Sequence, residues 1–174
     1  MKRVTPCAVG IGAVLNRVQQ MLDSAQIESA LKMLSGSKQH SPAIENAKGV
    51  CLLRLGRPEA ARKVFRDLAF PSGTFSTPDD TPTIFRVNYV TALLLLDKMD
   101  VGIQLLEEIP EKQHPLVQQL KDAVRQWEES LPWWRRILLL IGVYPSNLFH
   151  LDFAPGALGV PESLGGPKPV ERTT

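Results

Sequence analysis

The sequence has few cysteines, few aromatic residues and almost no excess of either charge. Its two cysteines, Cys7 and Cys51, could form at most one bridge, so the chain is not a small domain held together by many disulfides. This favours a reducing compartment, and we expect a cytoplasmic protein. The 20 basic and 18 acidic side chains are interleaved and leave no basic stripe, which argues against a nucleic-acid partner.

Long hydrophobic runs are also missing. The longest, residues 137–143, is far shorter than the roughly 18 residues of a membrane span. The N-terminus begins with Lys2 and Arg3 before an apolar stretch, as a signal peptide does. Because no cleavage pattern follows and Val14 and Val18 continue at helical spacing, we expect a first helix there instead.

The residues that catalysis requires are scattered. His40, His114 and His150 lie in or beside predicted turns, with no cysteine or carboxylate at ligand spacing. Neither a phosphate-binding glycine loop nor a nucleophile elbow is present, and Cys51 lies in an apolar stretch that favours a buried, unreactive thiol. We therefore expect no enzyme activity, no metal, no cofactor and no small-molecule substrate.

Apolar spacing and helix-ending residues instead predict an all-α fold. Ser41-Pro42 and Thr81-Pro82 are helix-start signals, with a capping side chain followed by a proline whose missing N–H costs nothing there. Turn-forming residues fill 70–80 and predict a loop. The predicted helices span residues 10–23, 27–34, 42–56, 58–68, 82–96, 101–109 and 115–130.

The chain also resembles itself. Residues 52–68 can be laid on residues 93–109 at a constant offset, since 93 − 52 = 41 and 109 − 68 = 41. Met21 and Ala25 echo Leu52 and Gly56 at a shift of 31. Such periods indicate stacked supersecondary units.

The middle unit resembles the tetratricopeptide repeat. Gly49, Leu52 and Gly56, followed by Ala61 and Phe65, give the small residues of the first helix and the small and aromatic residues of the second. The family's Trp and Tyr of the first helix are absent, which leaves a related helical-hairpin repeat open. The resemblance implies a right-handed superhelical stack of about three antiparallel hairpins over residues 1–131, closed by the helix 115–130 as a cap.

The resemblance further implies that the first helices of the hairpins line a concave groove for a peptide. Mapped onto this sequence, the groove positions are Asn16, Gln19, Asn46, Val50, Leu53, Arg54, Val87, Asn88, Thr91, Leu94 and Leu95. Few of them are the charged residues with which the family clamps a carboxylate, and the leucines and valines suggest an apolar trough.

Two segments follow the predicted stack. Residues 132–153 are apolar nearly all round and begin with Trp133, Trp134, Arg135 and Arg136, a pattern that fits either a membrane surface or a helix covered by the stack or a partner. Residues 154–174 are rich in proline and glycine and predict a flexible tail.

These features favour a protein–protein interaction scaffold. Its groove would receive an extended peptide or an amphipathic helix, supplied by a partner or by the chain's own residues 133–153. Two alternatives stay open: a secretion-type chaperone that sequesters an apolar export substrate, and a peripheral membrane scaffold that uses residues 133–143.

Overall fold

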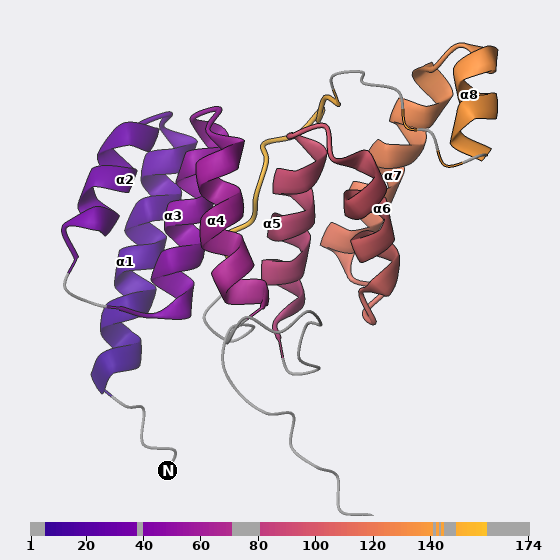
Figure 1. Ribbon diagram of the computed structural model, residues 1–174. Coiled ribbons are helices and arrows are strands. Elements are labelled where there is room, and N and C mark those ends of the chain that lie inside the picture. Colours follow the sequence, from indigo (N-terminus) through magenta and orange to yellow (C-terminus); the bar gives the residue numbers. More distant parts are fainter. Residues whose placement is uncertain are drawn as a thin grey trace, which may run out of the picture.

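In the computed structural model, which describes residues 6–37, 40–70, 81–140, 142, 144 and 149–159, all regular structure is α-helical. The predicted all-α fold class is therefore confirmed for this part of the chain (Figure 1). No helix within it is both long and apolar enough to cross a membrane. The helices are α1 (Pro6–Asp23), α2 (Ile27–Ser35), α3 (Pro42–Arg54), α4 (Pro58–Ala69), α5 (Thr83–Leu94), α6 (Met99–Glu108), α7 (Pro115–Ser130) and α8 (Trp133–Leu140).

The start of α3 follows the predicted signal. Ser41 has an extended backbone and its hydroxyl oxygen accepts a 3.2 Å hydrogen bond from the backbone N–H of Ile44, while Pro42 occupies the first turn. At α5 the same signal acts differently, because Pro82 itself is the capping residue and no side chain caps the helix.

Three turns of the chain share one geometry. Ala25, Gly56 and Asp97 all have positive φ, of 56°, 68° and 60°. They are separated by the repeat offsets, since 56 − 25 = 31 and 97 − 56 = 41. In each turn this residue donates its N–H to the carbonyl three positions back, and the next residue donates five positions back. This is the hydrogen-bond pattern of the Schellman motif, which closes a helix sharply and returns the chain beside it.

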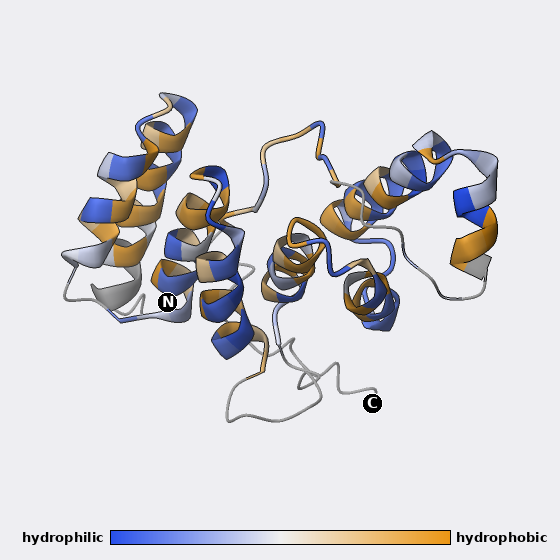
Figure 2. Ribbon diagram, turned by 45° about the horizontal axis from the view of Figure 1, so that its top comes forward, coloured by the Kyte–Doolittle hydropathy of each residue, from blue (hydrophilic) through white to orange (hydrophobic). Residues whose placement is uncertain are grey.

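Each helix from α1 to α6 packs on the helix that follows it. Helix α3 also packs on α1 and α5, and α5 also packs on α7. The helices consequently lie side by side in chain order, with α8 beyond α7 at one end (Figure 1). Figure 2 shows apolar residues on the helix sides that face one another and polar residues on the outer sides.

Glycines bring the paired helices close together. A Cβ added to Gly49 of α3 would lie 2.5 Å from ring atoms of Phe65 in α4. Between α5 and α6 the sizes are reversed, because Gly102 lies on the second helix and its added Cβ would be 2.7 Å from Cδ2 of Leu94. The α3–α4 and α5–α6 hairpins therefore each place a large side chain against the backbone of a glycine.

The buried apolar side chains form two clusters. The first is built mainly from α1–α4, and the second mainly from α5, α6 and α7. Residues 149–159, called the C-terminal segment below, connect them, because Phe149 belongs to the second cluster and Leu158 to the first. In Figure 1 this segment returns from the α8 end and runs through the space beside α5.

The C-terminal segment changes one expectation. Residues 154–159 were predicted to begin a flexible tail, yet residues 155–158 are hydrogen-bonded to α3 and α5. Sequence composition could not reveal this, because the partners are more than sixty residues away along the chain. Residues 160–174, the rest of that predicted tail, lie outside the described residues.

Candidate functional site

The C-terminal segment lies along the odd-numbered helices. His150 and Asp152 line a hollow with Trp127 and its neighbours on α7. Further along, Phe153 and Ala157 line a cavity with residues of α5 and α7. The last residues bond to α3. We call this surface of α3, α5 and α7 the groove.

Asn46 of α3 holds the segment by its main chain. Its amide nitrogen donates to the carbonyl oxygens of Ala157, at 3.0 Å, and of Leu158, at 3.1 Å. The Asn46 side chain is fully buried. Burying an amide whose N–H donors lack partners costs free energy, so the carbonyls of Ala157 and Leu158 stabilise the buried side chain of Asn46.

Asn88 of α5 binds the backbone of the same segment from the other side. Its amide nitrogen donates to the Ala157 carbonyl at 2.9 Å, and its amide oxygen accepts from the Ala157 N–H at 2.9 Å. The nitrogen also donates to Oδ1 of Asn46 at 2.8 Å. Both polar groups of the Ala157 backbone are therefore bound, and the two asparagines form one network.

Arg54, at the end of α3, extends the contacts toward the start of the segment. Its Nε donates to the Pro155 carbonyl at 3.3 Å, and its Nη2 to the Gly156 carbonyl at 3.4 Å. Between Arg54 and Asn46, the side chains of Val50 and Leu53 lie under Gly156, within 3.1 to 3.3 Å of where its Cβ would be. Hydrogen bonds from Arg54 and Asn46 to the backbone of the segment thus lie on either side of an apolar surface formed by Val50 and Leu53.

The structure brings together about half of the predicted groove residues: Asn46, Val50, Leu53, Arg54 and Asn88 all touch the segment. Val87 and Thr91 line the cavity beside it, and the Thr91 hydroxyl donates to the Val87 carbonyl. These assignments from the repeat pattern place side chains of α3 and α5 on one surface.

The other predicted groove residues lie elsewhere. Asn16 and Gln19 are exposed on α1, where Gln19 bonds to Asp23. Leu94 is fully buried against Gly102 of α6, so its assignment to the groove was wrong. Leu95 follows the end of α5 and packs against both clusters. The error arises near the helix end, where one residue of uncertainty rotates a side chain by about 100°.

The occupant matches the expected one only in part. Residues 133–153 were the candidate, and residues 150–153 do lie beside α7 and α5. Helix α8 lies beyond α7, however, and it is residues 155–158 that bond to α3 and α5. Two signals in the sequence could have pointed to them. Leu158 is a large apolar residue among prolines and glycines, and the repeat resemblance assigns to the groove Asn46 and Asn88, whose amides would need partners once buried.

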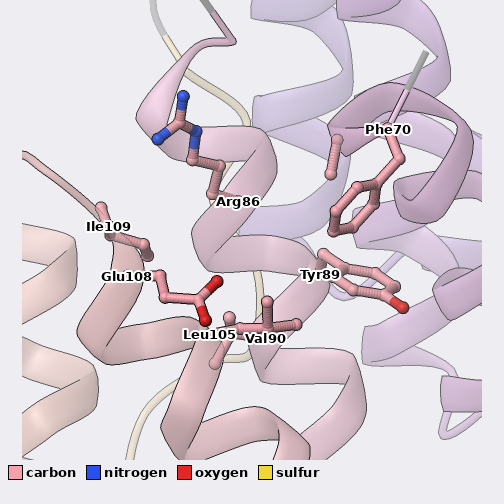
Figure 3. A pocket seen from close by; sticks show the side chains of 8 residues that line it. Phe70, Arg86, Tyr89, Val90, Leu105, Glu108 and Ile109 are labelled. Atoms are coloured by element: carbon pink, nitrogen blue, oxygen red, sulfur yellow. The ribbon is translucent and has the colours of Figure 1, made fainter. Parts of the chain in front are cut away.

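A second hollow lies on the other face of α5. Figure 3 shows Arg86, Tyr89 and Val90 of α5 lining it together with Leu105 and Glu108 of α6. Phe70 meets the Tyr89 ring edge to face, with ring centres 5.4 Å apart. The lining is largely apolar packing between helices and gives no constellation for chemistry.

Cys51 is buried in the first cluster beneath the groove. Burial raises the pKa of its thiol to about 11, and the nearby charge of Arg54 offsets only part of that rise. At neutral pH the thiol is protonated and poorly nucleophilic. Across the described residues, no three His, Cys, Asp or Glu side chains gather where they could hold a metal ion.

Helix α8 exposes its aromatic residues. Trp133 is 74% exposed and Trp134 is 49% exposed, and Arg135 lies over the Trp134 ring at 5.0 Å. Arg136 turns back instead: its Nε donates to the carbonyls of Glu128 and Leu131 at the end of α7. The four residues predicted as one contact surface are therefore divided, because Arg136 is used to cap α7.

No protein-family model, curated protein or solved structure matches this chain. The function must therefore be inferred from the groove and its occupant.

Proposed function

We propose that this protein is a scaffold whose groove holds an extended polypeptide, and that its own C-terminal segment occupies the groove until a partner displaces it. The observation that carries the proposal is the pair of buried asparagines, Asn46 and Asn88, bonded to the backbone of residues 157 and 158. Because these contacts are made to the backbone, they can hold a chain in place without depending on most of its side chains.

A tetratricopeptide-like architecture is part of the proposal. It is supported by the three identical turns at Ala25, Gly56 and Asp97 and by the packing of α3 on both α1 and α5. In a stack of hairpins the first helices share one face. The segment's contacts with α3, α5 and α7, the first helices of three successive pairs, fit that arrangement.

The ligand we propose is a non-helical stretch of polypeptide. Every described residue from 149 to 159 is outside a helix, and the bonded carbonyls are those that a helix would use internally. Arg54 binds two of these carbonyls, which belong to an internal stretch of polypeptide, and the proposed ligand is such a stretch.

A partner must compete with the chain's own C-terminal segment for the groove. A segment tethered to its own groove has an effective concentration on the order of millimolar. A partner therefore needs either better contacts or a second point of attachment. The free chain is then a closed form of the scaffold, and we propose the cytoplasm as the place where it acts.

The test uses a full-length chain whose own segment cannot bind. Gly156→Val places a branched side chain at a positive φ and against Val50 and Leu53, which should expel the segment. A fluorescein-labelled peptide of residues 152–161 is then titrated and followed by fluorescence anisotropy. We expect it to bind Gly156→Val and to bind the unaltered chain at least tenfold more weakly, because the tethered segment competes.

Two matched variants give the test its control. Adding Asn88→Ala to Gly156→Val removes the bonds to Ala157 and should abolish peptide binding, whereas adding Asn16→Ala, on exposed α1, should leave it unchanged. Circular dichroism verifies that each variant is folded. Absence of peptide binding to a folded Gly156→Val chain would reject the proposed function.

The exposed tryptophans of α8 favour a second candidate, a scaffold that also attaches to membrane surfaces. Trp133, Trp134 and Ile137 form an apolar exposed side next to Arg135, a composition typical of interfacial helices. Flotation with vesicles containing anionic lipid tests this. We expect Trp133→Ala with Trp134→Ala to lose flotation, and an unaltered chain that never floats would remove this candidate.

A further inference from the structure

One position of the groove accepts only glycine. Gly156 has a φ of +80°, a conformation that costs a side-chain-bearing residue free energy. Its missing Cβ would also meet Val50 Cγ2 at 3.1 Å and Leu53 Cδ1 at 3.3 Å. Val50 is fully buried and Leu53 nearly so, and neither can easily withdraw. Two independent constraints therefore select against any Cβ there.

A second position selects a large apolar side chain. Leu158 is 7% exposed and belongs to the first core cluster, together with residues of α1, α2, α3 and α4. Its side chain is the segment's anchor on that half of the protein. Between the two, Ala157 is half-buried, and what the groove binds there is its backbone N–H and carbonyl.

The chain contains a near copy of this stretch that fails the first requirement. Pro155, Leu158 and Gly159 recur six positions later as Pro161, Leu164 and Gly165. The position equivalent to Gly156 is Glu162, which has a Cβ and a charge. The sequence itself thus provides a matched peptide that differs at the position where glycine is required.

On this basis we propose that the polypeptides received by the groove carry a Gly-x-Leu motif whose glycine takes a positive φ, and that this motif is what displaces the chain's own Gly156-Ala157-Leu158. The inference rests on the proposed function and makes it specific. Glycine is required by the backbone conformation and the floor of Val50 and Leu53, leucine by the apolar core, and the middle residue only by its backbone.

The test compares labelled peptides on the full-length Gly156→Val chain. The reference is the peptide of residues 152–161, and its variants carry Gly156→Ala, Leu158→Ala or Ala157→Ser. We expect roughly tenfold or greater loss of affinity for the first two and less than about threefold change for Ala157→Ser. The peptide of residues 158–167, which carries Glu162, should not bind, and Glu162→Gly in that peptide should create binding.

The outcomes separate this inference from the proposed function. If the reference peptide binds and all variants bind equally well, the groove receives polypeptides without this motif and the inference is wrong. If no peptide binds a folded Gly156→Val chain, both the inference and the proposed function are wrong. Failure of Glu162→Gly to gain binding while the reference binds would also overturn the motif.

A measurement on the unaltered chain covers the case in which Gly156→Val does not fold. The Ala157 N–H is bonded to Asn88, so its NMR resonance reports whether the segment is in place. An excess of unlabelled reference peptide should shift this resonance toward its unbound position, and the Gly156→Ala peptide should not. An unmoved resonance at saturating peptide would contradict the inference.

Discussion

The side-chain amide of Asn88 on α5 donates a 2.8 Å hydrogen bond to the amide oxygen of Asn46 on α3. Both side chains are fully buried, and both also bond to the backbone of the C-terminal segment. Two first helices of neighbouring pairs are thus joined to each other and to a segment more than sixty residues further along the chain. Removing the segment would leave both side-chain amides without these protein partners.

We expect Asn88→Ala to destabilise the protein by about 1–3 kcal/mol, because it leaves the Ala157 N–H and one Asn46 acceptor without their partner. Urea unfolding followed by circular dichroism measures the change in the free energy of unfolding. Asn16→Ala is the control, and its exposed position on α1 should keep the change within about 0.5 kcal/mol. Equal effects of the two variants would show that the asparagine network does not stabilise the fold.

Leu158→Ala should loosen the C-terminal segment more than it destabilises the helices. Deleting a buried leucine side chain commonly costs about 2–5 kcal/mol, but a terminal segment can detach instead of leaving a cavity, which limits the cost. Hydrogen exchange of the Ala157 amide, which bonds to Asn88, should accelerate strongly. Leu151→Ala is the matched control, since Leu151 is only half-buried, and slower exchange than in Leu158→Ala is expected.

Gly49→Ala is expected to destabilise the α3–α4 pair by about 1–3 kcal/mol. The new methyl group would lie 2.5 Å from the Phe65 ring, which is fully buried and has nowhere to move. Thermal and urea unfolding measure the loss, and Phe65→Leu in the same chain should recover part of it. Gly36→Ala is the opposite case, with negative φ and its nearest atom at 3.5 Å, and should be neutral or stabilising by up to about 1 kcal/mol.

The Cys51 thiol should make stability fall at alkaline pH. Burial raises its pKa to about 11 in the folded protein, while an unfolded cysteine ionises near pH 8.5. Between these values the unfolded chain has lost a proton that the folded chain retains, so rising pH favours unfolding. Below that window the contribution is constant.

Comparison with Cys51→Ala isolates this effect, because all other titrating groups, including Cys7, are common to both chains. The unfolding free energy of the unaltered chain should drop relative to the variant by on the order of 2 kcal/mol between pH 8 and pH 10.5. Parallel pH profiles of the two chains would mean that the thiol ionises equally easily in both states.

The helices themselves follow from local signals. Ser41-Pro42 begins α3, and Gly56 forms the turn that separates α3 from α4. Both signals are local, because capping and positive φ depend on residues within one turn. The offsets of 31 and 41 residues between the repeats correctly aligned the turn at Gly56 with the turns at Ala25 and Asp97. The resemblance to the tetratricopeptide repeat implied that Asn46, Val50 and Asn88 share one surface, as they do, although it misplaced Leu94 at the end of α5.

What fills the groove was decided only by tertiary structure. Nothing near Pro155 in the sequence indicates that Arg54 will bind its carbonyl, because the groove binds the backbone, and backbone groups are the same in every residue. The sequence therefore determined the helices, their turns and the buried amides that need partners. The packing of α3 against α5 determined where those amides meet, and so which segment of the chain, far away along it, could satisfy them.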